Sequence, residues 1–109
     1  MALERNANGA LAWLQSWFLR QCNGAWEYEH GIRIQTDDYP GWIVVIHFGQ
    51  TDLSDATFDP IEIDLGDDDW MNCAVQRNAF YGSGDPSKLE AILDEFRRWA
   101  SSQPAKQIR

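Results

Sequence analysis

The sequence predicts a single α+β domain, in which an N-terminal and a C-terminal helix flank a mainly antiparallel sheet of four to five strands. Apolar residues recur at helical spacing near both ends of the chain, and alternating or continuous apolar runs fill the middle. The chain has 109 residues, 44% of them hydrophobic, which is enough for one core. We expect the domain to span residues 1–103 and a flexible tail to follow over residues 104–109.

The first predicted element is a helix over residues 9–22. Its apolar stripe consists of Leu11, Leu14, Phe18 and Cys22, widened by Trp13 and Trp17. Asn23-Gly24 is a plausible stop, because glycine adopts the left-handed conformation in which many helices end. Since its polar face is narrow, this helix must be covered on most sides, either by the rest of the domain or by a partner.

Strict alternation then predicts a strand over residues 26–36. One face would carry Trp26, Tyr28, His30, Ile32, Ile34 and Thr36, and the other would carry Glu27, Glu29, Gly31, Arg33 and Gln35. The segment 37–41 is expected to turn the chain. Pro40 would occupy the second turn position, and Gly41 would supply a positive φ at the third.

Further strands and a second helix complete the predicted domain. The apolar run at 42–48 predicts a central strand, segments 61–65 and 70–77 predict two more, and 79–81 predicts a short one after a turn at Arg77-Asn78. Residues 82–86 are expected to form a plain loop. Asp85 is predicted to cap a helix over residues 86–100, with Pro86 in its first turn.

The charge of the chain is strongly negative and unevenly distributed. The net charge is −8, and no Lys or Arg occurs between Ile34 and Gln76. That segment holds Asp37, Asp38, Asp52, Asp55, Asp59, Glu62, Asp64, Asp67, Asp68 and Asp69. Such a field repels phosphate backbones, so we expect no direct binding of nucleic acid. It suits either a basic protein partner or simply good solubility.

Two cysteines, Cys22 and Cys73, do not amount to a disulfide framework. The N-terminal residues lack the pattern of a signal peptide, and no apolar run is long enough to span a membrane. The sequence therefore predicts a cytoplasmic protein with reduced thiols and no membrane partner.

Catalysis and metal binding have little support in the sequence. Alternation would separate His30 from Glu27 and Glu29, which disfavours an acid–base cluster or a zinc site. The motifs of serine hydrolases, phosphate-binding loops and dinucleotide-binding folds are missing, and the triplet 67–69 lacks the ligand spacing of a calcium loop. We therefore expect no enzymatic activity, no cofactor and no metal.

A set of short motifs along the chain resembles a known family. They are Trp17, Gln21-Cys22, Gly24, Trp26-Glu27, Gly31-Ile32, Ile34, Thr36, Asp38, Pro40-Gly41-Trp42, Asp69-Trp70 and the Phe80-x-Gly82 step. This pattern resembles the immunity protein 53 family of bacterial polymorphic toxin systems over nearly the whole chain. The resemblance implies a small cytoplasmic protein that binds and neutralises a cognate toxin. Many toxins of such systems are nucleases, and an acidic inhibitor would suit their basic clefts.

The leading hypothesis is thus an immunity protein, monomeric or a weak dimer, that binds a basic toxin through an acidic surface. The candidate contacts are Glu27, Glu29, Asp37, Asp38, Glu62, Asp64, Asp67, Asp68 and Asp69, with Tyr39 or Trp42 as a possible aromatic anchor. For Trp42, a place in the core at the start of a strand is the competing interpretation.

Two alternatives belong to other functional classes. A small enzyme using Glu27, Glu29 or His47 would need a pocket in which these side chains converge. An adaptor that binds a partner through the apolar N-terminal helix would expose a patch of Trp13, Trp17 and Leu19.

Overall fold

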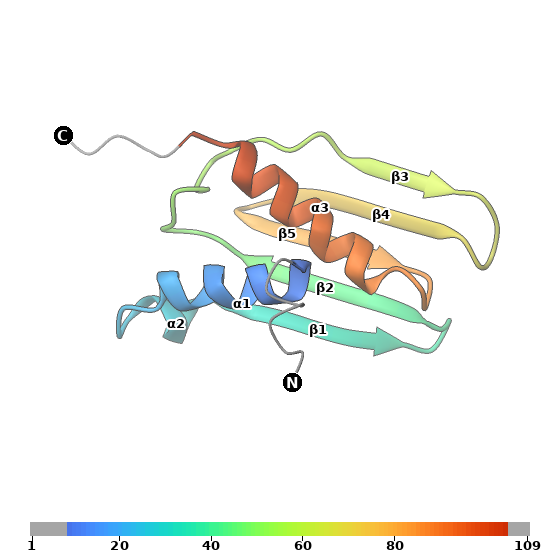
Figure 1. Ribbon diagram of the computed structural model, residues 1–109, viewed down its shortest axis with the longest axis horizontal. Helices are drawn as coiled ribbons and strands as arrows, with labels where there is room; N and C mark the ends of the chain where they lie inside the picture. Colours follow the sequence, from blue (N-terminus) through green and yellow to red (C-terminus); the bar gives the residue numbers. More distant parts are fainter. Residues whose placement is uncertain (1–8, 105–109) are drawn as a thin grey trace.

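The structure, a computed structural model, describes residues 9–104 and contains one sheet and two long helices (Figure 1). The elements are α1 (Ala10–Gln21), α2 (Trp26–Glu29), β1 (Ile32–Asp37), β2 (Gly41–His47), β3 (Ile61–Asp64), β4 (Trp70–Gln76), β5 (Ala79–Gly84) and α3 (Leu89–Ser102). The tail predicted over 104–109 lies, from residue 105 on, outside the described residues. No helix within residues 9–104 is long and apolar enough to cross a membrane.

The five strands form one antiparallel sheet in the order β1-β2-β5-β4-β3, which confirms the predicted fold class. Both α1 and α3 lie on the same face of this sheet (Figure 1). None of the helices in residues 9–104 lies on the opposite face, and we call it the open face. The molecule therefore has two layers, and only one side of the sheet contributes to the main core.

The core lies between the sheet and the two long helices, and it is rich in aromatic rings. Phe96 of α3 sits at its centre, with ring centroids 5.2 Å from Trp17, 5.3 Å from Phe80 and 5.9 Å from Trp99. Val44 and Ile46 of β2 add fully buried aliphatic side chains from the sheet. Because large aromatic side chains bury much apolar surface, this cluster contributes strongly to the stability of the domain.

The sequence prediction was wrong for the central strand β5, which runs to Gly84 instead of ending at residue 81. Residues 82–84 were expected to form a loop because they are glycine-rich, yet they pair with both β2 and β4. Glycine is needed at positions 82 and 84 because α3 packs closely against this strand. A Cβ atom on Gly82 would collide with the Cγ2 atom of Ile92, and one on Gly84 would lie 2.8 Å from the Cβ atom of Lys88. Their small size thus lets α3 approach the middle of the sheet.

The strand predicted over 26–36 was wrong in its first third, where the chain forms the helical turn α2. Local hydrogen bonds outweigh the alternating pattern there. The Oδ1 atom of Asn23 accepts from the backbone N–H groups of Ala25 and Trp26, both at 2.9 Å, as the cap of a helix does. Gly24 adopts a φ of +92°, which allows the turn between α1 and α2. Trp26 is nevertheless buried, as predicted.

Two other boundaries differ from the prediction. Gly41 does not supply a positive φ to the turn, since it opens β2 and pairs with Asp37. Glycine is needed at position 41 because a Cβ atom there would lie 2.7 Å from the carbonyl oxygen of Gly84. The C-terminal helix begins at Leu89 instead of residue 86 and extends to Ser102, and Asp85 makes no side-chain cap at its start.

Candidate partner-binding surface

The open face of the sheet carries an apolar stripe across its central strands. Strand register places Ile43 and Val45 of β2 beside Ser83 and Tyr81 of β5, and Tyr81 beside Ala74 of β4. Val45 is only 9% exposed, yet it is not part of the core that packs against the helices. This separation indicates that the apolar side chains of the open face form a second, smaller cluster of their own.

A hollow of about 590 Å³ lies over this stripe, and we call it the apolar hollow. Its floor includes Ile43, Ala74, Tyr81, Ser83, Asn72 and Trp70. Carboxylates stand at opposite sides of it, with Asp37 from β1 and Glu62 from β3. Because four strand spacings separate these two strands, the hollow extends roughly 19 Å across the sheet.

A second hollow of about 870 Å³ adjoins the first at the end where the β1–β2 and β3–β4 turns lie. We call it the acidic hollow, because Glu62, Asp64, Asp67 and Asp68 line it together with Tyr39 and Trp70. The two hollows share Glu62, Trp70 and Asn72, so they form one continuous surface. Within residues 9–104, none of its four acids makes an ion pair. Tyr39, which also lines the acidic hollow, is 90% exposed.

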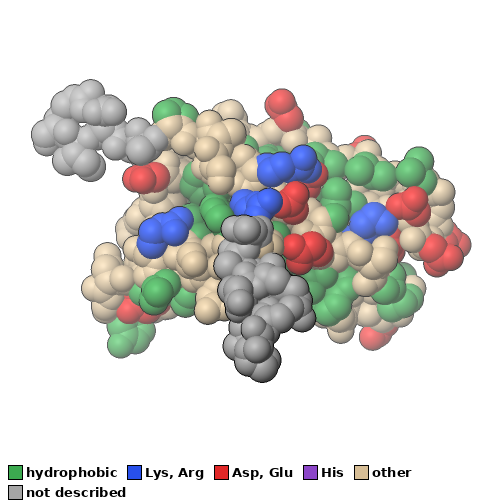
Figure 2. All heavy atoms as spheres, viewed as in Figure 1, with side chains coloured by type: hydrophobic (Ala, Val, Ile, Leu, Met, Phe, Trp, Pro, Cys, Tyr) green, Lys and Arg blue, Asp and Glu red, His purple; other side chains and the backbone are tan. Residues whose placement is uncertain are grey.

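The distribution of charge is visible from the side of the helices. Figure 2 shows acidic side chains at the right-hand end, where Figure 1 places the β3–β4 turn, whereas most of the Lys and Arg side chains visible from this side lie over the helices. The basic residues Arg97 and Arg98 are paired there with Asp94 and Glu95 of the same helix. The end that holds the acidic hollow therefore keeps acids without ion pairs in the described part of the chain, as do Glu27, Glu29, Asp52, Asp55 and Asp59 elsewhere.

The structure brings together six of the eleven candidate contacts. Asp37, Tyr39, Glu62, Asp64, Asp67 and Asp68 line one or both hollows. Asp38 is exposed in the same turn as Tyr39 without lining either hollow. Trp42 packs partly buried against the main core on the helix side, and its Nε1–H donates to the carbonyl oxygen of Pro86 at 2.9 Å.

Glu27 and Glu29 lie at the other end of the sheet, with the six-residue strand β1, about 20 Å long, between them and the β1–β2 turn. The Glu27 carboxylate accepts from the backbone N–H groups of Asn23 at 3.0 Å and Gly24 at 2.9 Å. Hydrogen bonding from its own backbone N–H and from these two groups lowers the pKa of Glu27 from its ordinary value. Glu27 thus holds the start of α2 in place.

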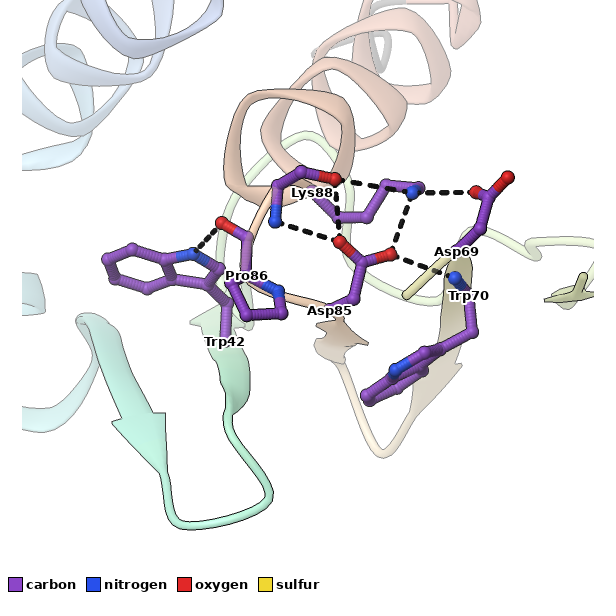
Figure 3. Close-up of polar contacts among 7 residues, drawn as sticks. Trp42, Asp69, Trp70, Asp85, Pro86 and Lys88 are labelled. Atoms are coloured by element: carbon purple, nitrogen blue, oxygen red, sulfur yellow. Dashed lines mark hydrogen bonds and ion pairs between the residues drawn. The ribbon is translucent and has the colours of Figure 1, made fainter. Parts of the chain in front are cut away.

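A buried carboxylate, that of Asp85, binds the backbone of Trp70, which lines both hollows (Figure 3). Asp85 is 1% exposed and accepts from the Trp70 backbone N–H at 2.8 Å, from the Ser87 N–H and Oγ–H, and from the Lys88 ammonium at 2.7 Å. Lys88 also bonds Asp69 at 2.8 Å. The Lys88 and Ser87 side chains lower the pKa of Asp85 far below its ordinary value, and Asp69 and Asp85 in turn raise the pKa of Lys88. Of the acidic triplet 67–69, Asp69 is therefore engaged within the fold.

The groups proposed for catalysis do not converge. His47 is exposed on the open face, and neither it nor Glu27 or Glu29 lines any of the hollows described above. His30 stacks on Trp26, with ring centroids 5.3 Å apart. Among residues 9–104, no three side chains of His, Cys, Asp or Glu are grouped so as to hold a metal ion. Burial and the nearby Glu95 raise the pKa of the Cys73 thiol to about 12, so this thiol stays protonated at neutral pH.

The patch proposed for an adaptor does not form as predicted. Trp17 is buried, where its ring meets those of Trp26 and Phe96 edge to face. Trp13 is half-buried against Phe96, and only Leu19, at 72% exposure, is open to solvent. Leu11, which was predicted to belong to the apolar stripe of this helix, is also 58% exposed, so the domain covers the apolar side of α1 only in part.

Sequence reasoning missed the apolar part of the surface, above all Trp70, Tyr81 and Ala74. Alternation over 70–77 did place Ala74 on the face opposite Met71 and Cys73, and that is the one signal available. Their assembly with Ile43 depends on the strand order, because β5 inserts between β2 and β4. That order follows from long-range pairing, which spacing along the chain does not reveal.

Similarity to known proteins identifies the family of the chain. No curated protein and no solved structure matches it. A family model, described as immunity protein 53, matches residues 11–101. This match covers α1, the whole sheet and nearly all of α3, and hence both hollows. The chain therefore belongs to the immunity protein 53 family.

Proposed function

We propose that this immunity protein neutralises its cognate toxin by direct binding, with the acidic hollow placed against a basic surface of the toxin. The observation that carries the proposal is the set of four carboxylates, Glu62, Asp64, Asp67 and Asp68, that line one hollow without cationic partners in the described chain. The exposed Tyr39 beside them offers a rigid aromatic contact of the kind favoured at interfaces.

The partner that best fits this chemistry is a nuclease toxin. A cleft that binds phosphate backbones is lined by Lys and Arg, and an acidic surface that fills it would exclude the nucleic acid. Complementary charge also accelerates encounter, which matters for an inhibitor that must act before damage accumulates. We propose that the protein acts in this way in the cytoplasm, without catalysis of its own.

Co-expression with the protein encoded next to this gene tests the proposal. The wild-type chain should restore growth to cells that make the toxin and should co-purify with it. The triple variant D64N/D67N/D68N should bind the toxin with an association rate lowered at least about tenfold at low salt. A wild-type chain that neither protects nor binds would refute the proposal.

A matched control is D52N/D55N/D59N. It removes the same three charges, taking the net charge from −8 to −5, at exposed positions that do not line the acidic hollow. The association rate of this control should stay within about twofold to threefold of wild type, since only long-range attraction is reduced. Equal losses in the two triple variants would show that net charge, and not the acidic hollow, drives binding.

A further inference from the structure

We infer that the apolar hollow on the open face receives a large apolar side chain of the toxin, which anchors the complex next to the acidic hollow. The inference rests on the proposed function and adds to it the chemistry of the partner's contacting segment. That segment would carry an aromatic or long aliphatic side chain close to Lys or Arg residues.

The hollow exists because small side chains alternate with large ones on this face. Ala74 and Ser83 are small, whereas Tyr81, Trp70 and Ile43 are large and stand around them. Register sets Ala74 directly opposite Tyr81 and sets Ser83 between Ile43 and Asn72. Cross-strand neighbours lie about 5 Å apart, so the two small residues leave a space between the rings.

The middle of this face is apolar where a solvated sheet would be polar, whereas its two edge strands carry Arg33, Gln35, Asp37, Glu62 and Asp64. An antiparallel sheet covered on one side normally alternates apolar residues inward with polar residues outward. Here β2 and β5 turn Ile43, Val45 and Tyr81 outward, and Tyr81 is 42% exposed. An apolar surface with a polar rim is typical of a protein–protein contact.

Charge complementarity identifies the occupant as the toxin and not a second copy of the chain. Asp37 and Glu62 stand at the sides of the apolar hollow, and Asp64, Asp67 and Asp68 follow in the adjoining one. Two copies meeting through this face would bring these carboxylates together against a single Lys or Arg per copy on the strands of the face, Arg33 of β1, and each copy carries a net charge of −8. A basic toxin meets the same carboxylates with attraction.

The two hollows would then have separate kinetic roles. The acids act over distance, so they set the association rate and its dependence on salt. The apolar contact forms only after docking, so it sets the dissociation rate and responds little to salt. This division distinguishes the inference from the proposed function, because each predicts a change in a different rate constant.

The test fills the hollow and measures both rate constants. In the Ala74→Phe variant a phenyl ring would occupy the space meant for the partner's side chain. In Gln76→Phe the same ring is added two residues further along β4, on the same face but outside the hollow. Association and dissociation with the immobilised, inactivated cognate toxin are recorded at 50 mM and 300 mM salt. Tyr81→Ser is a second variant, which removes part of the wall without adding bulk.

We expect Ala74→Phe and Tyr81→Ser to raise the dissociation rate about tenfold or more at both salt concentrations, with little change in association. Gln76→Phe should match the wild type within about twofold. Far-UV and near-UV circular dichroism show whether each variant is folded. The side chains of Ala74 and Tyr81 lie on the open face and are not part of the main core, so we expect both variants to fold.

Three outcomes would overturn the inference. Wild-type dissociation rates in folded Ala74→Phe and Tyr81→Ser, alongside slowed association in D64N/D67N/D68N, would leave the proposed function intact and remove the apolar anchor. A wild-type dimer that Ala74→Phe dissociates without affecting toxin binding, seen by sedimentation, would assign the face to a second copy. A wild-type chain that does not bind the toxin would remove the inference and the proposed function together.

Discussion

Asp85 ties three parts of the fold together through one buried carboxylate. Its oxygens hold the start of β4 through the Trp70 N–H, the turn after β5 through Ser87, and the residue before α3 through Lys88. A buried carboxylate is stable only when such partners replace the water it has lost. Because Trp70 lines both hollows, Asp85 also fixes the position of the candidate partner-binding surface.

Replacing Asp85 with Asn should reduce stability in a manner that depends on pH. The pKa of Asp85 is lowered in the folded protein, chiefly by Lys88 and Ser87, so the unfolded chain takes up the proton more readily. Its stabilising effect is complete above pH about 4, the ordinary value for Asp, and is lost as the pH falls toward the folded value. The urea midpoint of the wild type should therefore fall more steeply than that of Asp85→Asn between pH 5 and pH 2.5, and at pH 7 the variant should melt roughly 10 °C lower.

The exposed neighbour Asp69 serves as the control for this prediction. Its side chain is 53% exposed, and the pair of Asp85 with Lys88 survives without it. Asp69→Asn should thus lower the melting temperature by no more than a few degrees, as surface ion pairs contribute little.

The prediction for Asp85 itself would be contradicted by parallel acid profiles. If the urea midpoints of wild type and Asp85→Asn fall equally with pH, the Asp85 carboxylate does not cause the loss of stability in acid.

At the scale of elements, the contact of α3 with β5 depends on two glycines, Gly82 and Gly84, on the inner face of that strand. Gly82→Ala should destabilise the protein by about 2 kcal/mol, because the added methyl group meets Ile92, which is fully buried. Gly31→Ala is the matched control, since nothing lies within 4 Å of a Cβ atom there. Its effect should stay within about 0.5 kcal/mol. Chemical denaturation compares the two, and equal stabilities would contradict the tight contact.

The same contact explains which elements the sequence could predict. The two long helices and strands 61–65 and 70–77 follow from side-chain periodicity, since each buries one face against the core. Strand β5 was cut short because Gly82 and Gly84 have low strand propensity, and only the approach of α3 explains them. The turn α2 was read as strand because its alternating residues fit both structures, and the bonds from Asn23 and Glu27 decide between them.

For the candidate surface, the sequence was sufficient to name the acidic residues, but only the fold shows which of them lie together. Asp64, Asp67 and Asp68 could be named from the sequence, because ten acids in a segment without Lys or Arg are conspicuous. Glu27 belonged to the same list, and only the structure shows that its carboxylate caps a turn at the other end of the sheet. Trp70 and Tyr81 gave no signal of their own, since aromatic residues in strands usually belong to a core.

At the scale of the whole molecule, the two faces of the sheet have different physical roles. The helix side holds the aromatic core and the ion pairs of α3, which stabilise the domain. The opposite face keeps apolar side chains and unpaired acids in contact with water, and neither feature stabilises the free protein. A surface of this kind is retained where binding requires it, at a small cost to stability.

This contrast leads to a prediction on the free protein. The variant D64N/D67N/D68N should be slightly more stable than wild type at low salt, by about 0.5 kcal/mol or roughly 2–4 °C, because it relieves repulsion among neighbouring acids. The gain should vanish at 1 M salt, where charges are screened within about 3 Å. Thermal melts at 20 mM and 1 M salt measure it, with D52N/D55N/D59N as the control of equal charge change. If the two triple variants gain equal stability, the repulsion arises from the overall charge of the chain. If D64N/D67N/D68N instead loses stability, these acids stabilise the fold, which contradicts the view that they are free to bind a partner.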